Sequence, residues 1–68
     1  MFQLYAEREG HCIKQSDHLT TMDEASVILE TYEAFGYWPE GYDAVLYRGD
    51  DLATAEAWVY ADGWEKME

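Results

Sequence analysis

The pattern of apolar and polar positions begins with a repeat of two. Apolar side chains recur at every second position over residues 2–8, which predicts a strand with one buried face. Glu9-Gly10 fits a two-residue turn into a second strand over residues 11–15. Ala6 lies opposite Ile13 in this hairpin, so the apolar faces of the two predicted strands agree.

The pattern then changes to the spacing of a helix. A polar connection over residues 16–20 leads to Thr21-Met22-Asp23-Glu24, which matches a capping box with Thr21 at the N-cap. Gly36 is a natural stop at the other end. Between these signals, one apolar stripe at helical spacing contains Ala25, Ile28, Leu29, Tyr32 and Phe35.

Turn residues divide the second half of the chain. Trp38 precedes a proline and is expected to be extended, residues 39–41 predict a turn, and residues 42–48 predict a strand. Gly49-Asp50-Asp51 predicts a second turn.

Residues 52–60 have two interpretations. Leu52, Ala55 and Val59 fit a helix that Asp51 could cap. The β-rich residues 58–61, followed by Asp62-Gly63 and Trp64, instead indicate a hairpin. The hairpin signal favours a strand, and the helix remains the alternative.

These elements predict one α+β domain over residues 1–68, with the order β-β-α-β-β-β. One helix packs on one face of a small antiparallel sheet. The predicted strands carry apolar or aromatic residues on both faces, for example Ala44 against Val45 and Ala57 against Trp58. Either long aromatic side chains half-cover the second face, or that face binds a partner or a second copy.

The charge balance is strongly acidic. The chain of 68 residues has 15 Asp and Glu against 4 Lys and Arg, a net charge of −11, yet 49% of its residues are hydrophobic, which argues against a disordered tail. The single Cys excludes an internal disulfide framework. Nucleic acid and anionic lipid should repel such a chain, and basic protein surfaces should attract it. The sequence predicts neither a signal peptide nor a membrane span.

The acidic residues are unevenly spread. Lys and Arg are absent from positions 15–47, which hold Asp17, Asp23, Glu24, Glu30, Glu33, Glu40 and Asp43. On the predicted helix, Asp23, Ser26, Glu30 and Glu33 share the face opposite the apolar stripe.

This face extends over about 15 Å from Asp23 to Glu33. The helix macrodipole disfavours Glu30 and Glu33 by about 0.3–1 kcal/mol each. A helix selected for stability alone would carry Lys there, so the pattern points to a function. Solubility and salt adaptation are the alternative interpretations. Binding of a hard cation fails on spacing, because Asp50-Asp51 followed by Asp62 is not the graded loop with a central glycine that calcium sites use.

The number of acidic groups is comparable with that of duplex DNA. A compact chain of this length is about 28 Å across, and a duplex of that length carries about 16 phosphates. The 15 carboxylates match that number if most of them gather on one side.

Signals for catalysis or cofactor binding are weak. His11, Cys12 and His18 match no zinc pattern, and adjacent strand residues face opposite ways, so His11 cannot activate Cys12. Ser16 and Ser26 have no base in a recognisable arrangement, and there is no glycine-rich phosphate loop. We therefore predict no enzyme activity, no catalytic residues, no cofactor and no metal, and no direct binding of nucleic acid because the Lys and Arg that neutralise phosphates are missing.

The overall plan resembles small phage-encoded anti-CRISPR proteins. The resemblance rests on the short acidic chain, the first hairpin, the capped helix from Thr21, the turn Trp38-Pro39-Glu40-Gly41-Tyr42 and the hairpin Tyr60-Ala61-Asp62-Gly63-Trp64. It implies an inhibitor in the bacterial host cytoplasm that occupies the Lys- and Arg-lined DNA-binding surface of a CRISPR effector complex. The family shares no site motif that could be transferred by position.

We therefore predict a DNA-mimicking protein inhibitor. Carboxylates would pair with the Arg and Lys that normally hold phosphates, and exposed aromatic residues would provide buried anchors. The predicted partner-binding carboxylates are Asp23, Glu30, Glu33, Glu40 and Asp43, with Asp50 and Asp51 second. The predicted aromatic anchors are Trp38, Tyr42 or Trp58. The alternative is a non-enzymatic interaction module, such as a homodimeric adaptor or antitoxin-like protein, that uses an exposed aromatic sheet face.

Overall fold

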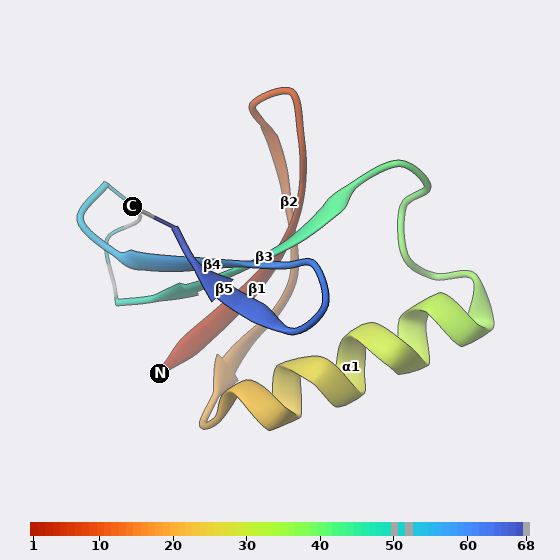
Figure 1. The fold of residues 1–68 in the computed structure, drawn as a ribbon, viewed down its shortest axis with the longest axis horizontal. Helices are drawn as coiled ribbons and strands as arrows, with labels where there is room; N and C mark the ends of the chain where they lie inside the picture. Colours follow the sequence, from red (N-terminus) through yellow and green to blue (C-terminus); the bar gives the residue numbers. More distant parts are fainter. Residues whose placement is uncertain (50, 52, 68) are drawn as a thin grey trace.

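The computed structural model describes residues 1–49, 51 and 53–67. The elements follow in the order β1 (Phe2–Arg8), β2 (His11–Leu19), α1 (Met22–Phe35), β3 (Asp43–Arg48), β4 (Glu56–Tyr60) and β5 (Trp64–Lys66). The strands form one five-stranded sheet in the order β2-β1-β3-β4-β5, and each neighbouring pair is antiparallel. The predicted α+β class and element order are confirmed. Figure 1 shows α1 along one side of the twisted sheet.

Local capping interactions set both ends of α1. The Thr21 hydroxyl accepts a hydrogen bond from the Glu24 backbone N–H at 3.3 Å, so the predicted N-cap is confirmed. At the other end Gly36 is left-handed, with φ 74°, and its N–H bonds to the Glu33 carbonyl. The next N–H, from Tyr37, bonds to the Tyr32 carbonyl at 2.8 Å. These two bonds form a Schellman motif, which reverses the chain direction after the helix.

One residue of the predicted apolar stripe does not reach the core. Phe35 is 68% exposed, so its assignment to the buried stripe was wrong. At 3.6 residues per turn, Phe35 lies about 80° around the helix from Ala25, at the border of the buried face. Its ring lies instead 6.0 Å from the Tyr37 ring, outside the core.

The second strand is longer than the sequence predicts. Residues 16–19, predicted as part of a polar connection, continue β2 as far as Leu19, which pairs with Phe2 and is 5% exposed. The β1–β2 register shifts twice, and His18 has φ 58°. Such bulges interrupt the alternation of side chains, so the polar end of β2 resembles a loop in the sequence.

The ambiguous segment is a turn followed by a strand. Asp51 does not cap a helix, because residues 53 and 54 form a turn, within which its carboxylate accepts the Ala53 N–H at 2.9 Å. The strand prediction is confirmed from Glu56 onward, but its predicted start before residue 56 was too early. Asp50 and Leu52 lie outside the described residues. The strand predicted over residues 42–48 begins one residue later, at Asp43.

The core lies between α1 and one face of the sheet. Leu4 and Leu46 are its fully buried centre, and Ala25 and Leu29 cover them from the helix. Trp58 pairs with Leu46 and packs against this cluster, on the helix side of the sheet. It is therefore not part of an uncovered aromatic face.

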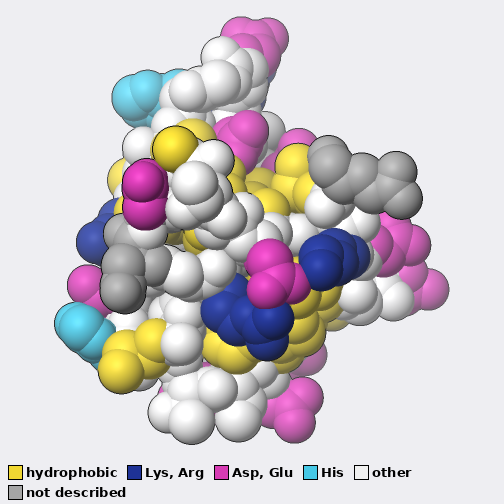
Figure 2. All heavy atoms as spheres, turned by 90° about the vertical axis from the view of Figure 1, so that its left-hand side faces the viewer, with side chains coloured by type: hydrophobic (Ala, Val, Ile, Leu, Met, Phe, Trp, Pro, Cys, Tyr) yellow, Lys and Arg dark blue, Asp and Glu magenta, His cyan; other side chains and the backbone are white. Residues whose placement is uncertain are grey.

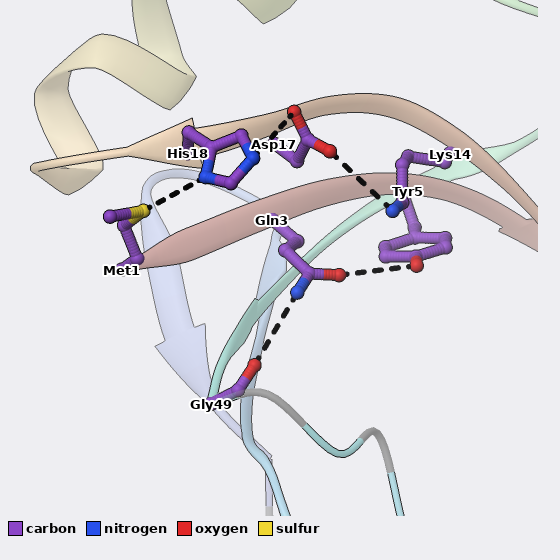
Figure 3. A network of polar contacts seen from close by, with 7 residues as sticks. All are labelled: Met1, Gln3, Tyr5, Lys14, Asp17, His18 and Gly49. Atoms are coloured by element: carbon purple, nitrogen blue, oxygen red, sulfur yellow. Dashed lines mark hydrogen bonds and ion pairs between the residues drawn. The ribbon is translucent and has the colours of Figure 1, made fainter.

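The side chains of the second sheet face cover one another. Tyr5 and Val45 are only 8% and 2% exposed there, although no helix lies over them. The Tyr5 and Tyr47 rings meet edge to face with centroids 5.4 Å apart. Figure 3 shows the Tyr5 hydroxyl donating to the Gln3 amide oxygen at 3.2 Å, while the Gln3 amide nitrogen donates to the Gly49 carbonyl.

Candidate acidic interface

Five of the predicted site residues surround one hollow. The hollow has a volume of about 410 Å³ and opens between the second half of α1, the following connection, the start of β3 and the end of β4. Its lining includes Glu33, Trp38, Glu40, Tyr42 and Asp43. The structure thus brings together side chains from a helix, a turn and a strand.

The connection from α1 to β3 builds one wall of the hollow. After the reversal at Gly36, the Trp38 indole N–H donates to the Tyr42 carbonyl at 3.0 Å and closes the turn from inside. The Tyr42 N–H bonds to the Pro39 carbonyl, and Gly41 has φ 82°. This confirms the predicted turn, in which Gly41 occupies the position that favours glycine. Glu40 is exposed at its apex.

The inner lining of the hollow is apolar and aromatic. Leu29 and Ala44, both buried, belong to the core and also line the hollow. Trp38, Tyr42 and Tyr60 are half-buried around them. The Tyr60 ring packs edge to face on Trp64, with centroids 5.0 Å apart, so part of its position is set by the β4–β5 hairpin.

Negative charge lies around the opening. Glu33 and Glu40 are exposed on two sides of the hollow, and Asp43 lines it at the start of β3. The last turn of α1 contains no basic residue, so the partial negative charge of the helix C-terminus is uncompensated there. Arg8 lies beside the turn, since a Cβ added to Gly41 would lie 3.0 Å from the Arg8 Nη1 atom.

Most basic side chains are engaged elsewhere. Lys14 lies 3.6 Å from the Asp17 carboxylate on β2. Arg48 and Lys66 both pair with Glu56, and the Lys66 Nζ atom is 2.7 Å from its carboxylate. Hydrogen bonds from Lys66 and Arg48 lower the pKa of Glu56 to about 2. Figure 2 shows Lys and Arg side chains beside an acidic side chain at this end of the molecule.

The other predicted site residues do not join the hollow. Asp23 and Glu30 are exposed on α1, outside its lining. Asp51 is exposed in the turn after β3, and Asp50 lies outside the described residues. Trp58 lies near Arg48 and Lys66, with the Lys66 Nζ atom 5.6 Å from the centroid of the Trp58 ring. Ser26 was wrongly placed on the open helix face, because it is half-buried and its hydroxyl accepts the Trp64 indole N–H at 2.9 Å.

The sequence did not predict the surface positions of Phe35 and Tyr37 or the place of Tyr60 in the hollow. Phe35 and Tyr37 are 68% and 69% exposed at the end of α1, beyond the core. Tyr60 was assigned to a hairpin, but its contribution to the hollow depends on the order of the strands. The helix stop at Gly36 is the signal that Phe35 and Tyr37 flank a change of direction.

Within the described residues, no group of three or more His, Cys, Asp and Glu side chains is placed to hold a metal ion. Burial and the negative charge of Glu7 raise the pKa of Cys12, which disfavours the reactive thiolate. In the same part of the chain, no helix has the length and apolar character needed to cross a membrane.

No protein-family model, no curated protein and no solved structure matches this chain. The hollow and the distribution of charge around it are therefore the basis for a functional proposal.

Proposed function

We propose that the protein is a non-enzymatic acidic inhibitor that docks on a basic, nucleic-acid-binding protein surface. The resemblance to anti-CRISPR proteins makes a bacterial CRISPR effector complex the proposed target. In this role the carboxylates of α1 and the following turn occupy the positions of DNA phosphates. The proposal assigns no catalytic residue and no cofactor.

The separation of charge within the molecule carries this proposal. Among the described residues, ion pairs with Lys or Arg involve only two carboxylates, Asp17 and Glu56, which engage three of the basic side chains. The predicted partner-binding carboxylates of α1, the following turn and the start of β3 make no such pair in the described part of the chain: Asp23, Glu30, Glu33, Glu40 and Asp43. A basic surface would give them the counter-charges that the chain itself does not supply.

The dimensions agree with a DNA mimic. The molecule measures 31 × 26 × 20 Å. A duplex as long as the longest dimension carries about 18 phosphates, against 15 carboxylates in the whole chain. Because these carboxylates are spread over α1, the turns and the strands, those of α1 and the following turn would replace only part of such a duplex. Figure 1 places the end of α1 and the connection to β3 at the opposite end of the molecule from the end of β3 and the start of β4. The hollow at the end of α1 is thus separate from the Arg48–Glu56–Lys66 ion pairs.

The test is competition with DNA. Affinity capture from bacterial lysate at low and high salt identifies bound complexes, and each purified complex is then titrated with the protein in the presence of its labelled target duplex. We expect the protein to displace the duplex, with an affinity that falls steeply as salt rises. If a captured complex binds protein and duplex at the same time, the proposed mimicry is wrong.

A further inference from the structure

We propose that the hollow between α1 and the Pro39–Tyr42 turn receives an arginine side chain of the partner. This inference rests on the proposed function, since it names the group that the acidic interface recognises. The hollow combines an aromatic and aliphatic lining with negative charge at its opening. That combination fits a side chain with an apolar stem and a flat cationic end.

The size of the hollow is suited to a side chain. Its volume of about 410 Å³ lies within the roughly 300–1,000 Å³ of small-ligand sites. The inner part is lined by Leu29 and Ala44, which can cover the aliphatic stem of a guest. Long basic side chains place their methylene groups on such apolar surfaces while the charged end remains near water.

The charges around the hollow select a cation. Glu33 and Glu40 stand on two sides of the opening, and the uncompensated C-terminal end of α1 adds negative potential. Arg8 lies beside Gly41, with its Nη1 atom 3.0 Å from where a Cβ of that residue would stand, but it is not among the residues that line the hollow. A cation from a partner can therefore enter without displacing an ion pair of the described residues.

The aromatic lining favours arginine over lysine. A guanidinium group is planar, stacks on aromatic rings and can bond two carboxylates through its fixed set of N–H donors. Trp38, Tyr42 and Tyr60 provide three rings around the hollow. Arginine is also enriched where proteins recognise phosphate, which is the surface that the proposed function requires.

The experiment is an NMR titration of the isotope-labelled protein with the peptide acetyl-Gly-Arg-Gly-amide. The Trp38 indole N–H reports on the hollow because it bonds to the Tyr42 carbonyl inside the turn. Peptides with citrulline or lysine at the central position test charge and shape, respectively. Glu33→Gln and Glu40→Gln remove one charge each at the hollow. Glu65→Gln, on the exposed edge strand β5, is the charge-matched control.

We expect the arginine peptide to shift the Trp38 indole signal in a saturable manner at low salt, with the citrulline peptide at least about tenfold weaker. Glu33→Gln and Glu40→Gln should each weaken binding about three- to tenfold, and Glu65→Gln should not. Equal binding of the citrulline or lysine peptide, or no shift of the Trp38 signal, would overturn the proposal. Peptide binding at the hollow without displacement of DNA from a captured complex would leave this assignment intact and refute the proposed function alone.

Discussion

Replacing Glu33 by lysine should stabilise the protein while it abolishes binding of the partner. Glu33 lies in the last turn of α1, where an acidic side chain opposes the helix macrodipole and no basic residue compensates. The side chain is exposed, and no ion pair with Lys or Arg is lost from the described residues by the change. At the same position, lysine interacts favourably with the helix terminus.

The expected increase in the free energy of unfolding of Glu33→Lys has two parts. Correcting the charge at the helix terminus contributes about 0.3–1 kcal/mol. A lysine at position 33 also stands three residues after Glu30, which gives an ion pair of about 0.2–0.5 kcal/mol. A total near 1 kcal/mol raises the melting temperature of a domain of this size by about 4–8 °C. Binding should change in the opposite direction, because the new cation stands beside the hollow that we assign to an arginine.

Two assays on one variant test this prediction. Thermal unfolding followed by circular dichroism gives the stability of Glu33→Lys, and the arginine peptide titration gives its binding. Glu65→Lys is the control, because it makes the same change in net charge on β5 and therefore reports the general relief of charge repulsion. If Glu33→Lys is no more stable than this control, or if it still binds the peptide, the reasoning about the helix terminus is wrong.

Three further predictions concern the sheet. Lys66 and Arg48 lower the pKa of Glu56 to about 2, so the contribution of Glu56 to stability is present above about pH 4.5 and is lost as pH falls toward 2. In urea unfolding, Glu56→Gln should therefore have a lower free energy of unfolding than the parent at pH 6, and the two values should converge near pH 2. Burial and the charge of Glu7 raise the pKa of Tyr47 to about 12; an absorbance titration should therefore show a tyrosine that ionises late, and Glu7→Gln should lower its pKa. Asp43 lies directly opposite Glu7 in the β1–β3 register, so the two carboxylates repel each other. Asp43→Asn should therefore raise the free energy of unfolding, measured in urea, by about 0.2–1 kcal/mol. An unchanged free energy of unfolding would contradict this repulsion.

Features set by neighbouring residues could be predicted from the sequence. Both ends of α1 follow from Thr21 and Gly36, since a cap needs only the backbone of the adjacent turn. The β1–β2 turn at Glu9-Gly10 and the pairing of Ala6 with Ile13 are equally local, and the register confirms them.

Features that depend on distant pairing could not be predicted. The end of β2 depends on two register shifts against β1. These shifts produce no recognisable pattern of apolar and polar residues in a polar stretch of sequence. The sequence identified the acidic residues as candidates, but it did not show which of them lie close together in the fold. Glu33 and Glu40 meet around one hollow because Gly36 reverses the chain between them, and Tyr60 joins them because β4 pairs with β3.

Two of the acidic residues that line the hollow stand in unfavourable charge environments. Glu33 opposes the helix terminus at its edge. Asp43 lies opposite another carboxylate, Glu7, across the β1–β3 pair. At the other end of the molecule the charges are balanced, because Arg48 and Lys66 both pair with Glu56. Strand alternation puts the Asp43 and Glu7 side chains on the sheet face of Val45, away from α1, so the conflict at the opening of the hollow is that of Glu33. A basic partner docked at the hollow would relieve the conflict at Glu33, so a charge that weakens the free protein would stabilise the complex.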